Sequence, residues 1–321
     1  MTISGHIQEL ATRVRGGNPR ALARAISIVE DRTSESTELL KALFPFSGNA
    51  VLLGLTGSPG AGKSTLVDQI AREYRKQDKT IGIVAVDPTS PFSGGAILGD
   101  RIRMQSHYAD PGIYIRSMAT RGSLGGLAST TADVATVLDA SGRDLVMIET
   151  VGVGQDEVDI VSLADVTVVV LVPGMGDDVQ TIKAGIMEIA DVFVINKSDR
   201  EGAERVEREI RAMQSLAMRK DNWTPPIVKT VASDGTGVPE VLQAIESYRV
   251  HLSVGDLGRR RRIDNWRKRI AEMLRDALFA RVINDYFADG EVDRIAAEVA
   301  EHKRDPYSLV EEIVGELGKR A

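Results

Sequence analysis

The stretch Gly57-Ser58-Pro59-Gly60-Ala61-Gly62-Lys63-Ser64 decides the fold, because it matches the phosphate-loop pattern GxxxxGK(S/T). An apolar run, Val51–Leu55, precedes it, and a helical pattern, Lys63–Lys76, follows. The glycines let backbone N–H groups turn toward phosphates, and the helix start adds a favourable dipole. Lys63 can then reach the β- and γ-phosphates, and the Ser64 hydroxyl can bind Mg²⁺. The alternative is a glycine-rich strand–helix turn. The predicted nucleotide-binding residues here are Gly60, Ala61, Gly62, Lys63, Ser64 and Thr65.

Around this unit, short β-branched runs alternate with longer helical patterns between residues 50 and 250. Most of the runs are continuously apolar, as expected of strands that are covered on both faces. The alternation predicts an α/β fold, a mostly parallel sheet flanked by helices, with right-handed crossovers. The predicted strands are Ala50–Thr56, Thr80–Asp87, Ile113–Met118, Asp144–Glu149, Val166–Val172, Val192–Asn196 and Ile227–Ala232. The predicted helices between them are Lys63–Lys76, Leu124–Ala140, Asp177–Ala190 and Glu201–Met218.

Both ends of the chain have helical patterns. Asn18 and Pro19 are typical of a helix cap and first helical position, and they predict the helix Arg20–Asp31, followed by Ser36–Phe44. We therefore expect an N-terminal helical extension (1–48), a P-loop core (49–252) and a C-terminal helical arm (253–321). The arm has apolar side chains at helical spacing, among them Ile263, Trp266, Ile270, Met273 and Leu274. These could dock a second copy or pack on the chain's own core. The run Arg259–Arg262 predicts a solvated helix start rather than a nucleic-acid or membrane site.

Composition narrows the class of protein. The chain has 321 residues and a net charge of −6, which disfavours a basic nucleic-acid binder. It contains no cysteine, which excludes disulfides, catalytic thiols and Cys-based metal sites and fits a reducing, cytoplasmic location. The start, MTISGHIQELATRVRGG, has no apolar segment typical of a secretory signal. No run approaches the ~20 apolar residues of a membrane span.

A second motif, Asn196-Lys197-Ser198-Asp199, follows a predicted strand and fits NKxD, the guanine-reading motif of GTPases. The Asp199 carboxylate would accept hydrogen bonds from guanine N1–H and the 2-amino group, which adenine does not offer. Lys197 would lie over the base, and Asn196 would tie this loop to the phosphate loop. A polar turn is the alternative. Ser233 follows Val231-Ala232 where GTPases contact the guanine carbonyl, although a glycine-rich turn explains that stretch equally well.

A third motif, Glu149-Thr150-Val151-Gly152, stands where GTPases usually have DxxG. A carboxylate at Glu149 can hold the Mg²⁺ shell through water, and the N–H of Gly152 can sense the γ-phosphate. Val153 comes next and cannot orient a water molecule. Whether Gln155 substitutes for a catalytic glutamine stays open.

Together, GSPGAGKST, VDPTS, ETVGVGQ and NKSD resemble the MeaB/ArgK family over nearly the whole chain. These proteins are G-protein chaperones of adenosylcobalamin-dependent acyl-CoA mutases, within a wider class of metallocentre-assembly GTPases. The resemblance implies that Asp87 serves the Mg²⁺ and phosphate region. It also implies that Asp100 and Arg103 lie in a mobile switch near the metal and γ-phosphate. A salt-bridged helix residue is the alternative for Arg103.

The run Pro173–Lys183 resembles the family's additional switch, which transmits the nucleotide state to the mutase. The resemblance places Asp177, Gln180 and Lys183 in that role. Asp177 and Gln180 also form a capping-box-like helix start, and both interpretations can hold.

The motifs indicate a Mg²⁺-dependent GTPase, and the lack of an obvious water-orienting glutamine predicts slow turnover that a partner accelerates. The resemblance implies that this partner is a cobalamin-dependent mutase, methylmalonyl-CoA mutase or a close relative. It also implies a homodimer formed through the arm. The expected catalytic residues are Lys63, Asp100, Arg103 and Glu149, and the expected Mg²⁺ ligands are Ser64, Asp87, Asp100 and Glu149. GTP and Mg²⁺ are the expected cofactors, and neither nucleic acid nor membrane is an expected partner.

Two alternative functions remain. A metal-delivery GTPase of the same class is disfavoured, since His6, His107, His251 and His302 stand alone in the sequence. An ATP-dependent kinase linked to amino-acid transport would need to accept adenine, which Asp199 opposes.

Overall fold

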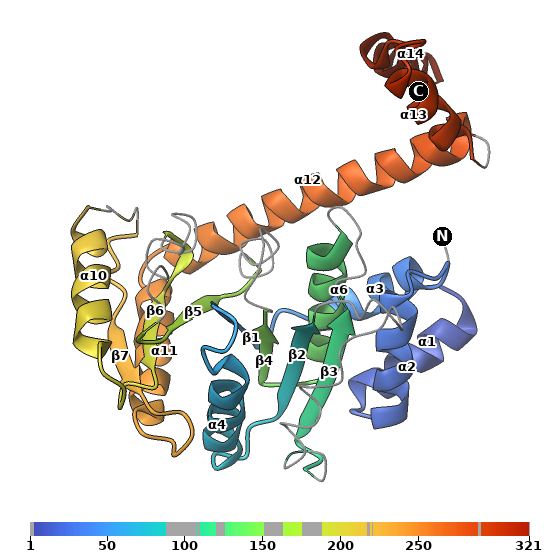
Figure 1. Ribbon diagram of the computed structural model, residues 1–321. Helices are drawn as coiled ribbons and strands as arrows, with labels where there is room; N and C mark the ends of the chain where they lie inside the picture. The colour runs from blue at the N-terminus through green and yellow to red at the C-terminus, as the bar shows by residue number, and fades with distance from the viewer. Residues whose placement is uncertain are drawn as a thin grey trace. The chain divides into compact units, whose positions relative to one another are not determined.

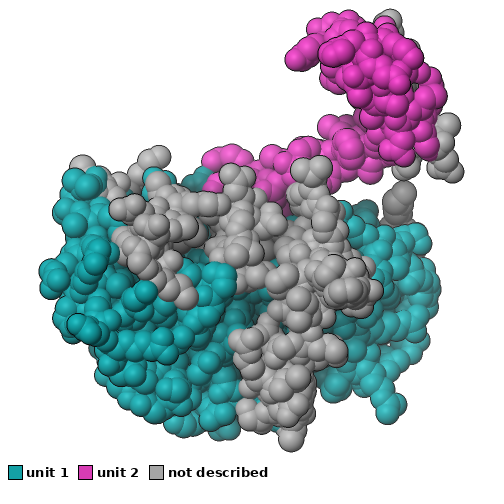
Figure 2. Space-filling model, in the orientation of Figure 1, with its two compact units in different colours: residues 1–265 teal, residues 266–321 magenta. Residues whose placement is uncertain are grey.

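The computed structural model describes residues 3–87, 107, 110–119, 126–150, 163–174, 188–216, 219, 221–287 and 290–320. The chain divides into two compact units, residues 1–265 and 266–321 (Figure 2). The three-part division at residues 48 and 252 stays a prediction.

The first unit is built on one seven-stranded sheet with the strand order β3-β2-β4-β1-β5-β6-β7 (Figure 1). Every neighbouring pair is parallel, which confirms the predicted fold class. The strand order reverses at β1, and parallel sheets bind ligands beyond the carboxyl ends of their strands at such a point. The strands are β1 (Val51–Gly57), β2 (Ile81–Asp87), β3 (Ile113–Ala119), β4 (Leu145–Glu149), β5 (Val166–Leu171), β6 (Val192–Asn196) and β7 (Ile227–Thr230).

Helices cover both faces of the sheet. Helices α4 (Lys63–Arg75) and α11 (Val238–Ser253) bury their apolar sides against one face. Helix α10 (Ala203–Leu216) packs on alternate residues of β5 and β6, that is, on the opposite face, because strand side chains alternate. That face also carries α6 (Gly126–Ala140) over β2 and β4.

The N-terminal helices share one apolar core with α6. They are α1 (Gly5–Arg15), α2 (Pro19–Glu30) and α3 (Ser36–Leu43), followed by the short 3₁₀ helix η1 (Phe44–Phe46). As predicted, Asn18 caps α2: its Oδ1 accepts a hydrogen bond from Ala21 N at 2.9 Å, and Pro19 occupies the first turn. Buried side chains of α1, α2 and α3 contact the same cluster as Val134 and Leu138 of α6. These helices are therefore part of the packed first unit.

Asp139 near the end of α6 fastens the segment that leads into β1. Its side chain is 5% exposed and accepts hydrogen bonds from the backbone N–H groups of Gly48, Asn49 and Ala50. Such carboxylate–amide hydrogen bonds each contribute about 1.5–3 kcal/mol.

We expect Asp139→Ala to lower the free energy of unfolding by about 3 kcal/mol, because three amide groups would lose their acceptor at a buried site. Asp139→Asn, which keeps one acceptor oxygen, should cost less. Urea unfolding monitored by circular dichroism measures both. Equal stability of wild type and Asp139→Ala would contradict the stabilising role assigned to the hydrogen bonds of Asp139.

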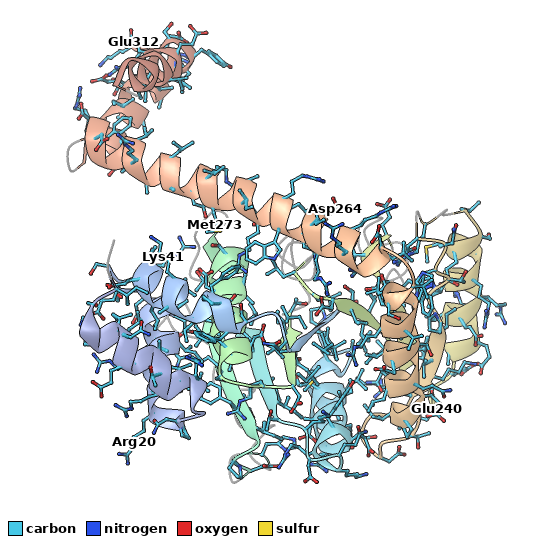
Figure 3. All side chains as sticks on the ribbon, turned by 180° about the vertical axis from the view of Figure 1, so that it is seen from behind. Arg20, Lys41, Glu240, Asp264, Met273 and Glu312 are labelled. Carbon is cyan, nitrogen blue, oxygen red and sulfur yellow. The ribbon has the colours of Figure 1, made fainter. Side chains whose placement is uncertain are left out.

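After α11, the described residues form the helices α12 (Leu257–Tyr286), α13 (Glu291–Ala300) and α14 (Pro306–Arg320). Within the second unit, α12 leaves large apolar side chains exposed, including Ile270, Met273, Leu278 and Phe279 (Figure 3 labels Met273). Across the parts of the chain that are described, no helix combines the length and apolar composition that a bilayer crossing needs.

Candidate nucleotide-binding site

The loop between β1 and α4 has a backbone that only glycine accommodates well. Gly60 and Gly62 have φ values of +75° and +90°, in the left-handed region. A Cβ atom on Gly62 would stand 2.3 Å from Asn196 Nδ2, and one on Gly57 would stand 2.0 Å from Val170 O. The loop is thus closely packed against β5 and the end of β6, and its glycines are required by geometry.

Lys63 opens α4 and folds back over its own loop. It is 5% exposed, and its Nζ donates hydrogen bonds to Gly57 O at 2.6 Å and to Ser58 O at 3.1 Å. A positive charge is therefore held beside the start of α4, where the backbone N–H groups of the first turn also attract anions. The arrangement is suited to binding phosphates.

Ser64 and Glu149 meet at the carboxyl edge of the sheet. Ser64 Oγ donates a hydrogen bond to Glu149 Oε1 at 2.6 Å, and both residues are buried. Parallel pairing of β1 with β4 sets Glu149 opposite Leu55, just before the phosphate loop. A hydroxyl and a carboxylate oxygen are the hard donors that Mg²⁺ prefers, so this donor set fits the metal. Asp87 ends β2 at the same edge, while its side chain lies outside the described residues.

Asn196 joins three segments through one buried amide. Its Nδ2 donates to Ala61 O of the phosphate loop at 2.8 Å. Its Oδ1 accepts from Ala232 N at 3.0 Å and from Thr230 Oγ1 at 3.1 Å. The expected contact between the NKxD motif and the phosphate loop is therefore present. The Asn196 side chain also connects both to the end of β7.

The neighbours of Asn196 strengthen this junction. Lys197 Nζ donates to Gly60 O at 2.8 Å, which gives the two loops a second contact. Ser198 N donates to Thr230 O at 3.0 Å. Asp199 is exposed on the loop after β6, and Ser233 is exposed on the loop after β7. Buried hydrogen bonds from Asn196 to Thr230 and Ala232 join these two loops, which carry the residues predicted to read a guanine base.

Several predicted site residues fall outside the described part of the chain: Asp100, Arg103, Gly152, Asp177, Gln180 and Lys183. Their roles stay predictions. Among the residues that are described, no three His, Asp or Glu side chains gather as a potential metal site.

The sequence analysis missed Thr230, which is fully buried and whose hydroxyl donates a hydrogen bond to Asn196 Oδ1. The available signal was a threonine near the end of a predicted strand.

A phosphate loop at the carboxyl edge of a parallel sheet, joined to an NKxD segment, defines a P-loop nucleotide-binding protein of the GTPase class. The family described as methylmalonyl-CoA mutase-associated GTPase MeaB matches residues 22–286, and the chain belongs to this family. Family membership makes it a GTPase that binds guanine nucleotides.

Several relatives are similar along most of their length. A Pyrococcus abyssi protein named “Putative GTPase” is 48% identical over 318 residues, 97% of each chain. GTPase ArgK of Escherichia coli is 35% identical over 296 residues, 90% of this chain and 88% of its own. The mouse mitochondrial methylmalonic aciduria type A homolog is 34% identical over 79% of this chain and 66% of its own. A crystal structure described as LAO/AO transport system kinase superposes with a TM-score of 0.72 at 25% identity, covering 99% of this chain and all of its own.

Proposed function

We propose that this GTPase is a chaperone of an adenosylcobalamin-dependent acyl-CoA mutase, methylmalonyl-CoA mutase or a close relative. In this role GTP gates cofactor loading and the protection or reactivation of the mutase. The junction at Asn196 carries the guanine-nucleotide part of the proposal, because it connects the phosphate loop with the base-reading motif. The mutase in the family's description supports the client.

In the proposed mechanism, the phosphate loop and Lys63 bind and orient the phosphates of GTP. Ser64 and Glu149 hold Mg²⁺, with Asp87 and Asp100 as the further predicted ligands. When bound, Mg²⁺ neutralises charge on the β- and γ-phosphates. Asn196, Lys197, Asp199 and Ser233 fix the guanine base, and Arg103 and Gly152 act at the γ-phosphate. Most of the rate enhancement then comes from positioning and charge stabilisation.

The same residues imply slow turnover of the isolated protein. Val153 stands directly after Gly152 and has no polar group to orient the attacking water. We infer that the mutase complex completes the site, with Asp177, Gln180 and Lys183 signalling between the nucleotide and the client.

The test compares GTP hydrolysis by the pure protein with hydrolysis in the presence of the mutase purified from the same cell. We expect the mutase to raise kcat at least about 100-fold, the low end of what one added catalytic group contributes. A nickel- or zinc-delivery role would instead show tight binding of those metals by the pure protein. Equal rates with and without mutase would overturn the chaperone proposal while leaving the GTPase class intact.

The proposed Mg²⁺ ligands give a separate prediction. Ser64→Ala removes a hydroxyl that is 2.6 Å from Glu149 Oε1, so the Mg²⁺ concentration for half-maximal hydrolysis should rise roughly 10- to 100-fold. Titrating GTPase activity with Mg²⁺ measures this shift. Ser247→Ala, at an exposed position on α11, is the matched control and should leave the titration unchanged. A Ser64→Ala titration that overlays the wild-type curve would contradict the assignment.

We also propose that a second copy covers the exposed apolar side of α12, so that the protein is a homodimer. Ile263, Trp266, Ile270 and Met273 recur along this helix at the alternating spacing of three and four residues found in paired helices, and all are exposed. Light scattering should give twice the chain mass, and a mass near 34.7 kDa would contradict the dimer.

A further inference from the structure

In the basic run Arg259–Arg262, only the Arg261 side chain points toward the interior of the first unit. Arg259, Arg260 and Arg262 are exposed, as predicted for a solvated helix start, whereas the Arg261 side chain is 24% exposed. The expectation of a uniformly solvated run is therefore wrong at Arg261. Its partner is Asp191, which is fully buried directly before β6. The helix phase explains the difference, because only one of four successive helical residues can face the core squarely.

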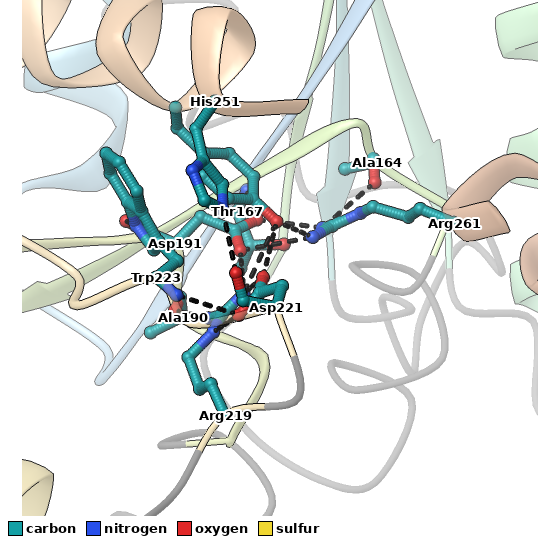
Figure 4. Close-up of polar contacts among 10 residues, drawn as sticks. Ala164, Thr167, Ala190, Asp191, Arg219, Asp221, Trp223, His251 and Arg261 are labelled. Carbon is teal, nitrogen blue, oxygen red and sulfur yellow. Dashed lines mark hydrogen bonds and ion pairs between the residues drawn. The ribbon is translucent and has the colours of Figure 1, made fainter. Parts of the chain in front are cut away.

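Asp191 binds two guanidinium groups (Figure 4). Arg261 contacts it with both terminal nitrogens, at 3.1 Å to Oδ1 and 2.8 Å to Oδ2. Arg219 donates to Oδ1 at 2.9 Å, and Thr167 N of β5 donates to Oδ2 at 2.9 Å. Two-point contact between a guanidinium and a carboxylate is strong and strictly oriented. The first turns of α12 are thereby fixed to the start of β6.

A second layer of contacts closes around this ion pair. Tyr248 of α11 is fully buried, and its hydroxyl accepts hydrogen bonds from Arg261 and from Arg219, the latter at 3.3 Å. Burial raises the pKa of Tyr248, and the neighbouring Asp191 carboxylate raises it further, so the hydroxyl stays protonated. Trp223 Nε1 donates to Asp191 O at 2.9 Å. The cluster thus binds together β5, β6, α11, α12 and the segment that leads into β7 (Figure 4).

The opposite end of β6 carries the guanine motif. β6 runs only from Val192 to Asn196, is buried throughout, and pairs in parallel with β5 and β7. Asp191 precedes this strand, and Asn196 ends it. The segment 219–223, which contains Arg219 and Trp223, leads into β7. The last residue of β7, Thr230, donates a hydrogen bond to Asn196. A strand this short, paired on both sides, transmits a shift at one end to the other, because packed elements do not deform smoothly.

We propose that Arg261 is a positioning residue for guanine-nucleotide binding. By holding Asp191 it fixes β6, and so couples the first turns of α12 to the affinity for GDP and GTP. The proposal rests on the guanine-binding role proposed for Asn196 and Asp199. Because coupling between two sites is reciprocal, bound nucleotide must in turn stabilise the start of α12.

The test measures dissociation of a fluorescent GDP analogue from the full-length protein. Arg261→Leu should speed dissociation about 5-fold or more, the usual lower range for coupled sites. Arg261→Lys, which keeps the charge and loses the two-point contact, should fall between Arg261→Leu and wild type. Arg260→Leu, its exposed neighbour, is the matched control and should change the rate less than 2-fold. Hydrogen exchange of residues 257–265 in the wild type should slow when GDP is added.

A purely structural role would lower the melting temperature of Arg261→Leu and leave GDP dissociation within 2-fold of wild type, and this would overturn the proposal. An equal effect of Arg260→Leu would do the same. If Arg261→Leu does not fold, Tyr248→Phe, which removes one hydroxyl from the cluster, must speed dissociation for the proposal to stand. Wild-type protein that binds no guanine nucleotide would instead refute the guanine-binding proposal itself, so the two failures are distinct.

Discussion

Replacing Lys63 with alanine is expected to slow GTP hydrolysis about 100- to 1,000-fold, the usual cost of removing one charge-stabilising donor from such a site. Lys63 is buried and directed along the loop carbonyls of Gly57 and Ser58, so its ammonium has little freedom to lose on meeting phosphate. The substitution also removes the two hydrogen bonds from Lys63 to the loop, so it destabilises the loop of the nucleotide-free protein. Single-turnover hydrolysis and GTP affinity, measured together, separate the two contributions.

Lys76→Ala is the control for that experiment. Lys76 directly follows the same helix, is exposed, and forms a surface ion pair with Glu73 at 2.6 Å. Its removal should leave hydrolysis unchanged, since exposed ion pairs of this kind contribute little. If Lys63→Ala, correctly folded by circular dichroism, keeps more than a third of the wild-type rate, Lys63 does not act on the phosphates.

The second large effect is expected in the recognition of the guanine base. Asp199→Asn should weaken GDP binding roughly 100-fold or more and favour xanthine nucleotides, because donor and acceptor change places at the base edge. Asp199 is exposed, while the loop beneath it is fixed by Asn196 and by the contact from Ser198 N to Thr230 O. The substitution should therefore change the recognition of the base and leave the loop in place.

Competition experiments measure this change. GDP, XDP and ATP are each titrated against a fluorescent guanine nucleotide on wild type, Asp199→Asn and Glu201→Gln. Glu201 is a nearby exposed acid, so its substitution should leave base preference unchanged. ATP that displaces GDP from the wild type as well as GTP does would refute guanine selectivity and favour the ATP-dependent kinase alternative.

Local signals predicted the sheet and the phosphate loop. Most strands are short apolar runs, and the loop is eight consecutive residues whose spacing alone carries its geometry. The contact between Asn196 and Ala61 was also predictable, because the motif follows a strand that ends at the same edge. Thr230 was missed because its role depends on the β6–β7 register, which pairs it with Asn196.

Two misses have different causes. Helix α1 was not predicted separately, although Ser4 is a preferred N-cap residue and Ile7, Leu10, Ala11 and Val14 recur at helical spacing, so both sequence signals were present. Arg261 looks identical to its three neighbours in the sequence. Only the packing of α12 against a carboxylate 70 positions away distinguishes it.

The shared core of the N-terminal helices has a consequence for biosynthesis. Helices α1, α2 and α3 leave the ribosome before α6, yet their apolar sides pack on α6, which ends at Ala140. At elongation rates of about 5–20 residues per second, they wait roughly 5 to 20 seconds for that partner. During this interval their apolar sides are available to chaperones and to other nascent chains. A circular permutant that begins at residue 49 and appends residues 1–48 to the C-terminus would be synthesised with α6 ahead of these helices, and a larger share of it should stay soluble during cell-free translation than of the wild type.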